Sequence, residues 1–289
     1  MTATGWSHTA LAKETVFGVA ILLGLICYGT IQHPASVTQG GDLILTTAVG
    51  FLIAYGAAAL WNRRHGSGAM SIALMIGAAL GLIVGAVEMV NISLETSGSV
   101  NQTIRGIAPP TAMALMALLF GTAGSMAYQR TSSFRLAVWS GIWCALIGTI
   151  LTCIFGFAYS VGFMPYMEQI NHVEYLRSGM QDPSAFVIRK TLHDMSSHLV
   201  IAPLMAAFFS CSGALISAYL EPAECRVVIT FAFFGVLQLA LGVGAIRWAS
   251  SLARPQRPPF IMIGMLASGI ALTYVYAVFS ALALRRTSK

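Results

Sequence analysis

One carboxylate of this chain stands inside a long apolar stretch. Glu88 lies about two turns from the outer end of its apolar run. An ionisable side chain at membrane depth is costly, so this position predicts a protonation site or a ligand for a cation. The structural alternative is that Glu88 extends to the nearby interface or pairs with a neighbouring helix.

A second candidate combines a carboxylate with an imidazole. Asp194 and His198 are four residues apart, on one helical face at the start of the sixth apolar run. Such a pair can relay protons, because histidine titrates near neutral pH. The structural alternative places Asp194 in the first helical turn, where exposed N–H groups favour a negative charge. No third and fourth ligand follow at a recognisable spacing, so we predict no metal site.

Two hydroxyls complete the candidates for an ion pathway. Thr149 and Thr152 could line a hydrated path, or they could bond to their own backbone or to an adjacent helix. The chain shows no nucleophile–base set, phosphate-binding loop, dinucleotide fingerprint or haem-binding histidine pair. The sequence therefore predicts neither an enzyme nor a bound cofactor.

The composition defines the elements that must position these residues. Apolar residues make up 57% of the chain, charged residues only 9%, and the mean hydropathy is +0.77. A soluble domain carries about a quarter charged residues, so this chain could not cover a water-facing surface. We expect an all-α, polytopic transmembrane helical bundle in one integral membrane domain over 1–289. The net charge of +6 is typical of contact with anionic lipid, and no nucleic-acid partner is predicted.

The apolar runs predict eight spans arranged as tandem hairpins. Each run is close to the 20 residues that a membrane helix needs. A proline pair, Pro109-Pro110, is expected to open the fourth span, and Pro203 to kink the sixth. The predicted spans are 15–33, 42–61, 68–91, 109–129, 134–160, 197–219, 226–247 and 259–284.

Basic residues predict the orientation of the chain. Tight basic turns follow the even-numbered spans, and longer polar loops follow the odd-numbered ones. By the preference of Lys and Arg for the cytoplasmic side, we expect an inner (plasma) membrane protein with both termini in the cytoplasm. The longest loop, 161–196, is then extracytoplasmic, and 167–176 could form an amphipathic interfacial helix.

Three basic side chains are expected at the outer mouth of the bundle. Arg105, Arg189 and Lys190 precede the second helix of each central hairpin. They either pair with Glu88 or Asp194 across the mouth, or they anchor the helices at the interface.

Small residues recur at a spacing of four in two of the runs. At helical pitch each set forms one stripe on which another helix backbone can approach closely, which is how helices associate in lipid. The first stripe is Gly77, Gly81 and Gly85, and the second is Gly148, Thr152 and Gly156.

The two central hairpins, 68–130 and 134–221, are predicted to be related. The segment 81–85 corresponds to 148–152, and the segment 125–128 corresponds to 216–219. Internal repeats of this kind are common in transport proteins and also occur in structural bundles.

Three short sequence motifs, which we call marks, follow one another in the first central hairpin. They are Gly81-Leu82-Ile83-Val84-Gly85, then Gly106-Ile107-Ala108, then Met126-Ala127-Tyr128-Gln129-Arg130. In these marks and their spacing, 81–130 resembles the paired helices of the MotA/TolQ/ExbB proton-channel family. The resemblance implies a homo-oligomeric ring around the transmembrane segment of a single-span partner, coupling ion flow to mechanical work.

The chain departs from that family at several polar positions. The family's acidic residue after Gly-Ile-Ala falls on Pro109, and its helix-borne threonine falls on Ala114. The threonine of its glycine element is Leu82 in the first hairpin and is present only as Thr149 in the second. The family's large cytoplasmic segment is also missing between the predicted spans.

Three functional hypotheses follow from these patterns. The first is an ion-translocating, energy-coupling membrane protein. The second is a small-solute secondary transporter with a polar cavity at which Glu88, Thr149 and the Pro203 kink converge. The third is a non-conducting scaffold in which the stripes only pack.

Overall fold

The computed structural model describes residues 8–65, 68–97 and 102–219, and within these ranges every regular element is a helix. The helices are α1 (His8–Gln32), α2 (Ala35–Thr38), α3 (Asp42–His65), α4 (Gly68–Thr96), α5 (Gln102–Thr131), α6 (Phe134–Gly162), α7 (Met164–Ile170), α8 (His172–Ser178) and α9 (Pro183–Tyr219).

Six of the described helices are long and apolar enough to cross a membrane, namely α1, α3, α4, α5, α6 and α9. They correspond to the first six predicted spans, so the all-helical membrane class is supported. The seventh and eighth predicted spans, 226–247 and 259–284, lie outside the described residues.

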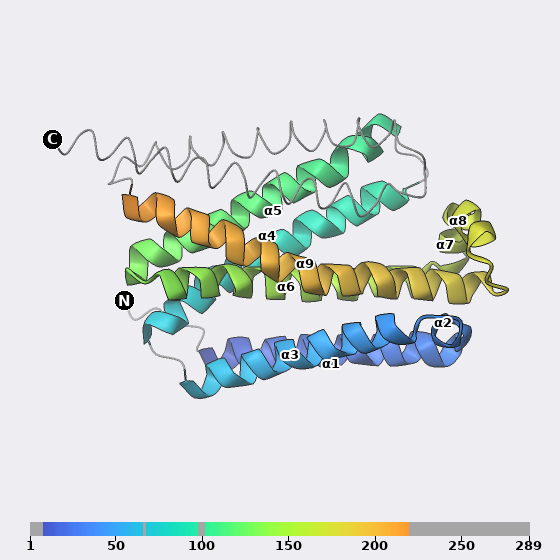
Figure 1. The fold of residues 1–289 in the computed structure, drawn as a ribbon, viewed down its shortest axis with the longest axis horizontal. Helices are drawn as coiled ribbons and strands as arrows, with labels where there is room; N and C mark the ends of the chain where they lie inside the picture. The colour runs from blue at the N-terminus through green and yellow to red at the C-terminus, as the bar shows by residue number, and fades with distance from the viewer. Residues whose placement is uncertain (1–7, 66–67, 98–101, 220–289) are drawn as a thin grey trace.

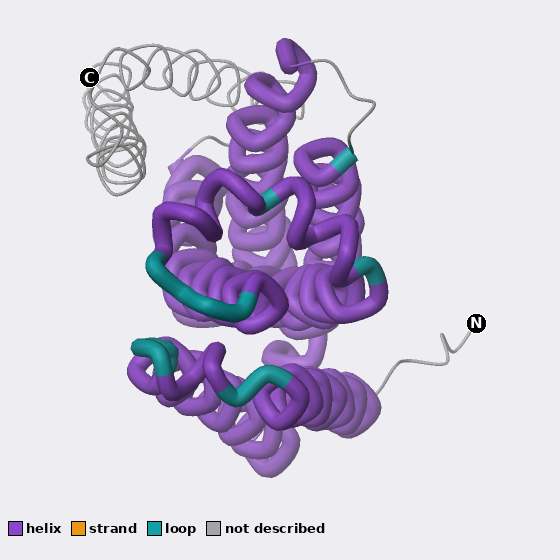
Figure 2. The backbone as a smooth tube through the Cα atoms, turned by 90° about the vertical axis from the view of Figure 1, so that its right-hand side faces the viewer, coloured by secondary structure: helices purple, strands orange, loops and turns teal. Residues whose placement is uncertain are grey.

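The long helices form three layers (Figures 1 and 2). The hairpin of α1 and α3 lies on one side, α6 and α9 form the middle layer, and α4 and α5 lie on the other side. The largest buried cluster joins the outer hairpin to the middle layer through residues such as Leu22, Leu52, Phe157 and Leu199. On α4 the buried positions recur every three or four residues and end at Glu88, which is the period of one helix face.

The two ends of the bundle differ in the elements and residues that they carry. The end of α3, the start of α4, the α5–α6 turn and the end of α9 lie at one end (Figure 1), which we call the basic end. It carries Arg63, Arg64, Arg130 and Arg135. The short helices α2, α7 and α8 lie at the opposite end, which we call the capped end.

The predicted loop 161–196 is largely helical, which corrects two expectations. Instead of one amphipathic helix over 167–176, α7 and α8 are separated at Asn171. The sixth span begins at Pro183 rather than at 197. The reason is local: Asp182 accepts hydrogen bonds from the N–H groups of Ser184 and Ala185 at 2.9 and 3.2 Å, so a polar residue starts the helix well before the apolar run.

The early start of α9 also shows that Asp194 does not lie in the first helical turn, as the structural alternative for this residue expected. That residue lies about three turns inside α9, where no exposed N–H groups remain to favour its charge.

The prolines occupy helix interiors. Pro109 and Pro110 lie inside α5, which begins at Gln102, so the expectation that they open the span is wrong. Polar residues ahead of the apolar run continue the helix beyond it. Pro203 lies inside α9, and α9 changes direction along its length in Figure 1, as expected for a helix that contains a proline.

Candidate functional site

The contact between α4 and α6 is made by the glycine stripes. A Cβ atom added to Gly77 would overlap the carbonyl oxygen of Ser140, and one added to Gly81 would lie 2.6 Å from that of Cys144. A Cβ atom on Gly148 would lie 3.2 Å from the carbonyl oxygen of Gly81. The two backbones are therefore in direct contact, and residue numbers rise together along the contact, so α4 and α6 run parallel.

The remaining stripe positions differ in how tightly they pack. A Cβ atom on Gly85 would lie 3.0 Å from the Cβ of Leu151, so this glycine also lies in close contact. One on Gly156 would meet only the Cδ1 of Ile92 at 3.7 Å. The second stripe therefore makes its closest approach at Gly148 and loosens toward the capped end.

A second pair of parallel helices, α5 and α9, is also joined through small residues. Added Cβ atoms at Gly124 and Gly213 would overlap the backbones of Ser210 and Gly121 respectively. The hydroxyls of Ser125 and Ser217 lie 2.5 Å apart. Ser125 and Ser217 belong to segments of the predicted repeat, but the sequence analysis did not single out Gly121, Gly124, Ser210 or Gly213 as contact residues.

Two ionisable candidates meet across the bundle. The Oε2 atom of Glu88 on α4 lies 4.0 Å from the Nε2 atom of His198 on α9. Both helices pack against α5 and α6 but not extensively against each other, so the two side chains bridge opposite corners of a four-helix group. Only 6% of the Glu88 side chain is exposed, compared with 44% of the His198 side chain.

The protonation of His198 is constrained by its own helix. Its Nδ1 atom lies 2.8 Å from the carbonyl oxygen of Asp194, and because a carbonyl only accepts, Nδ1 carries the hydrogen. Nε2 is then the ring nitrogen without a hydrogen in the neutral tautomer, and it is the one that faces Glu88. The predicted relay paired the imidazole of His198 with the carboxylate of Asp194. In the structure the ring contacts the main-chain carbonyl of Asp194 instead, and the carboxylate within ion-pair distance of the ring is that of Glu88.

Further polar side chains extend from this pair toward the capped end. The Nδ2 atom of Asn91 donates to Oε1 of Glu95 at 3.4 Å, and Glu95 interacts electrostatically with Glu88, Asp194 and His198. We call the residues of α4, α8 and α9 in this series the polar seam: Glu88, Asn91, Glu95, Glu174, Lys190, Asp194 and His198. Glu88 is buried whereas Glu95 and Asp194 are exposed, so the seam leads from the interior to the surface.

The basic candidates do not form ion pairs with Glu88 or Asp194. A terminal guanidinium nitrogen of Arg105 donates to the carbonyl oxygen of Ser97, and Arg189 donates to that of Gln39 at 2.9 Å. The Nζ atom of Lys190 pairs with Glu174 of α8 at 2.7 Å. These side chains hold the capped end together instead of neutralising the buried carboxylate.

The two threonines of α6 are both buried, with 4% of each exposed. The hydroxyl of Thr152 donates to the carbonyl oxygen of Gly148 at 2.9 Å. Thr152 therefore bonds to the backbone of its own helix, which was the alternative to lining a hydrated path. Thr149 lies on the same helix, and neither threonine lines either pocket described below. Glu88 and Pro203 are also outside those pockets, so no cavity described here gathers the residues that a transporter was expected to share.

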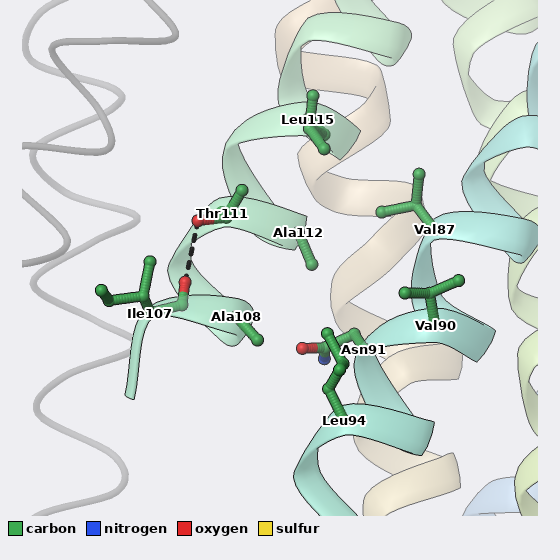
Figure 3. A pocket seen from close by; sticks show the side chains of 9 residues that line it. All are labelled: Val87, Val90, Asn91, Leu94, Ile107, Ala108, Thr111, Ala112 and Leu115. Carbon is green, nitrogen blue, oxygen red and sulfur yellow. Dashed lines mark hydrogen bonds between the residues drawn. The ribbon is translucent and has the colours of Figure 1, made fainter. Parts of the chain in front are cut away.

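An apolar groove lies beside the polar seam, between α4 and α5 (Figure 3). It has a volume of about 260 Å³, and its only polar side chains are Asn91 and Thr111. The Thr111 hydroxyl donates to the carbonyl oxygen of Ile107 at 2.8 Å. The Oδ1 atom of Asn91 is buried and has no partner among the described residues. With so few polar atoms, the groove offers an ion almost no ligands. Its lining residues are Val87, Val90, Asn91, Leu94, Ile107, Ala108, Thr111, Ala112 and Leu115.

Polar groups that could hold a metal are not clustered in the part of the chain that the structure describes. No set of three or more His, Cys, Asp or Glu side chains is arranged there for metal binding. The seam residues interact as charges and hydrogen-bonding groups along α4, α8 and α9.

Parallel, closely packed apolar helices with a polar seam define a class of protein. This is the architecture of a multi-pass helical membrane protein, in which backbone groups are satisfied within each helix. Comparisons with models of protein families, with curated proteins and with solved structures found no match.

Proposed function

We propose that this chain is an ion-translocating membrane protein in which protons are carried through the pair formed by Glu88 and His198. One observation supports this most directly: the Oε2 atom of the buried Glu88 carboxylate lies 4.0 Å from the Nε2 atom of the His198 imidazole. Ionisable side chains at membrane depth are expensive and are retained chiefly along ion pathways and proton relays.

A shared proton makes the pair workable inside the bundle. With the proton on His198, the two groups form an ion pair; with the proton on Glu88, both are neutral. Neither form leaves an unpaired charge in the interior, so the proton can move without the full penalty of burying an isolated ion. The surface-exposed Asp194 and Glu95 offer a route for exchange with water at the capped end.

The resemblance to the MotA/TolQ/ExbB family adds an energy-coupling role to the proposal. In that role α4 and α5 belong to a homo-oligomer or bind a partner with one transmembrane helix. Because Pro109, Ala114 and Leu82 replace the family's polar residues, the proton-binding task passes to Glu88 and His198.

Duplication of the central hairpins is part of the same proposal. Gly81 and Gly148, which correspond in the predicted repeat, lie against each other. The ends of α5 and α9 meet through Ser125 and Ser217, which are one position out of register in that repeat. Contacts between corresponding positions on parallel helices are what a two-fold arrangement of duplicated hairpins would produce.

The test is proton flux into proteoliposomes that contain the purified full chain. A potassium diffusion potential drives protons inward, and an entrapped pH-sensitive dye reports them. We expect Glu88→Gln and His198→Gln each to lower the flux at least about tenfold, because each removes a group that must bind the proton. Glu14→Gln is the control, since it makes the same change on an exposed carboxylate of α1 outside the polar seam, and it should retain most of the flux.

Three other results would count against the proposal. Equal losses in Glu88→Gln and Glu14→Gln would show that the effect is not specific to the proposed pathway. The absence of flux in every version would favour the scaffold. Saturable uptake of a small solute that survives Glu88→Gln would favour the secondary transporter.

A further inference from the structure

A pocket of about 520 Å³ opens at the basic end, where α3 ends and α4 and α6 begin. Its walls combine aromatic and polar side chains, including Trp61, Asn62, Phe134, Arg135 and Trp139. Trp61 and Phe134 are exposed, with 63% and 39% of their surfaces accessible. Aromatic rings at the ends of membrane-length helices are typical of the level of the lipid headgroups.

One side chain of this pocket is buried with an unused donor. Asn62 is only 2% exposed, and its Oδ1 atom accepts a hydrogen bond of 3.1 Å from Nε1 of Trp139. Because an indole nitrogen can only donate, this bond fixes which end of the amide is oxygen. The Nδ2 atom then has no partner among the described residues. A buried donor left in this way costs about 1–3 kcal/mol, so the site favours a ligand that supplies an acceptor.

The charge around Asn62 indicates an acidic acceptor. Arg135 lines the same pocket, is exposed, and lies within ion-pair distance of no described carboxylate. Arg63 and Arg64 directly follow Asn62 in the chain and add to the positive potential of the basic end. A guanidinium and an amide N–H that line one pocket suit the oxygens of a phosphate group.

We propose that this pocket binds the headgroup of an anionic phospholipid, with phosphate oxygens accepting from Nδ2 of Asn62 and from the Arg135 guanidinium. Trp61 and Phe134 then contact the apolar part of the lipid. The same oxygens occur in free phosphate, but the aromatic walls and the position at helix ends favour a ligand with a hydrocarbon portion. This site is separate from the Glu88–His198 pair and does not depend on the proposed proton pathway.

The experiment uses the detergent-purified full chain and measures its thermal unfolding as phosphatidylglycerol, phosphatidylcholine or inorganic phosphate is added. We expect phosphatidylglycerol to raise the melting temperature in a saturable way, and the other two to have little effect. Native mass spectrometry of the same samples should show retained phosphatidylglycerol. Stabilisation by inorganic phosphate to the same extent would overturn the lipid assignment and leave an anion site.

Two substitutions test the residues. Arg135→Gln should weaken the apparent affinity for phosphatidylglycerol at least about tenfold, the equivalent of one charged hydrogen bond. Arg130→Gln makes the same change at the same end outside the pocket, and it should leave the affinity nearly unaltered. Equal losses in the two variants would show that the attraction is general electrostatics. Asn62→Leu should remove the response to phosphatidylglycerol. Because it also leaves Nε1 of Trp139 without its acceptor, the response is measured from the lipid-free melting temperature of the variant itself. A full response in this variant would contradict the proposed contact.

Discussion

The hydroxyl of Tyr55 donates a hydrogen bond of 2.7 Å to the main-chain carbonyl of Leu199. Leu199 lies four residues before Pro203 on α9, and proline has no N–H to bond that carbonyl in the regular helical pattern. Tyr55 is buried on α3, with 6% exposed. Tyr55 of α3 thus donates to the Leu199 carbonyl the hydrogen bond that Pro203 cannot donate.

Replacing this tyrosine by phenylalanine should therefore be costly. We expect Tyr55→Phe to lower the free energy of unfolding by about 1–3 kcal/mol, because a buried carbonyl loses its partner. Thermal unfolding in detergent measures the change. In a Pro203→Ala background the residue 203 N–H can bond Leu199, so the same substitution should cost clearly less. Equal costs in the two backgrounds would show that the hydroxyl does not compensate for the proline.

The pair of Glu88 and His198 should be asymmetric in stability. His198→Leu leaves the Glu88 carboxylate buried without its partner, and we expect a loss of about 1–3 kcal/mol, reduced by the partial exposure of the histidine. Combining it with Glu88→Leu should recover most of that loss, because no buried charge remains. Unfolding of the two single variants and the double variant tests this, and additive losses would mean that the groups are not coupled.

The glycine contacts predict opposite outcomes for one substitution at two sites. Gly81→Ala places a methyl group 2.6 Å from the carbonyl oxygen of Cys144, whereas Gly156→Ala places it 3.7 Å from a side-chain carbon. The first should destabilise the bundle by about 1–3 kcal/mol through forced separation of α4 and α6, and the second should be neutral or slightly stabilising. Melting temperatures in detergent compare them; a tolerated Gly81→Ala would argue against backbone contact there.

The α5–α9 contact can be tested by cross-linking. Because the hydroxyls of Ser125 and Ser217 lie 2.5 Å apart, cysteines at both positions should form a disulfide under mild oxidation. Mass spectrometry of a protease digest would detect the linked peptides. Each single substitution is a control, since neither should add a cross-link between α5 and α9. Failure of the double variant to oxidise would contradict the close contact between Ser125 and Ser217.

Much of the helical content followed from composition and periodicity. The apolar runs predicted six of the described helices, because about 20 apolar residues are both necessary and nearly sufficient for a membrane helix. Their ends were less predictable. The start of α9 at Pro183 depends on the Asp182 cap, and the start of α5 at Gln102 lies in polar sequence, so hydropathy alone placed both starts too late.

The candidate site was only half visible in the chain. Glu88 stood out because it is charged within an apolar run, and His198 because it follows Asp194 by one turn. Nothing in either segment says which helix faces which, since a helix presents the same local pattern to any neighbour. The pairing of Glu88 with His198, rather than of Asp194 with His198, was beyond sequence analysis.

By itself the sequence determined that the chain belongs in a bilayer, where its long helices run, and that glycine stripes would allow backbones to touch. These properties depend on hydropathy and helical pitch, which are local. The tertiary structure alone decided that Gly81 meets Gly148, that Tyr55 replaces the donor missing at Pro203, and that Glu88 reaches His198. Each of these joins residues more than 60 positions apart, and such contacts depend on how all the helices pack together.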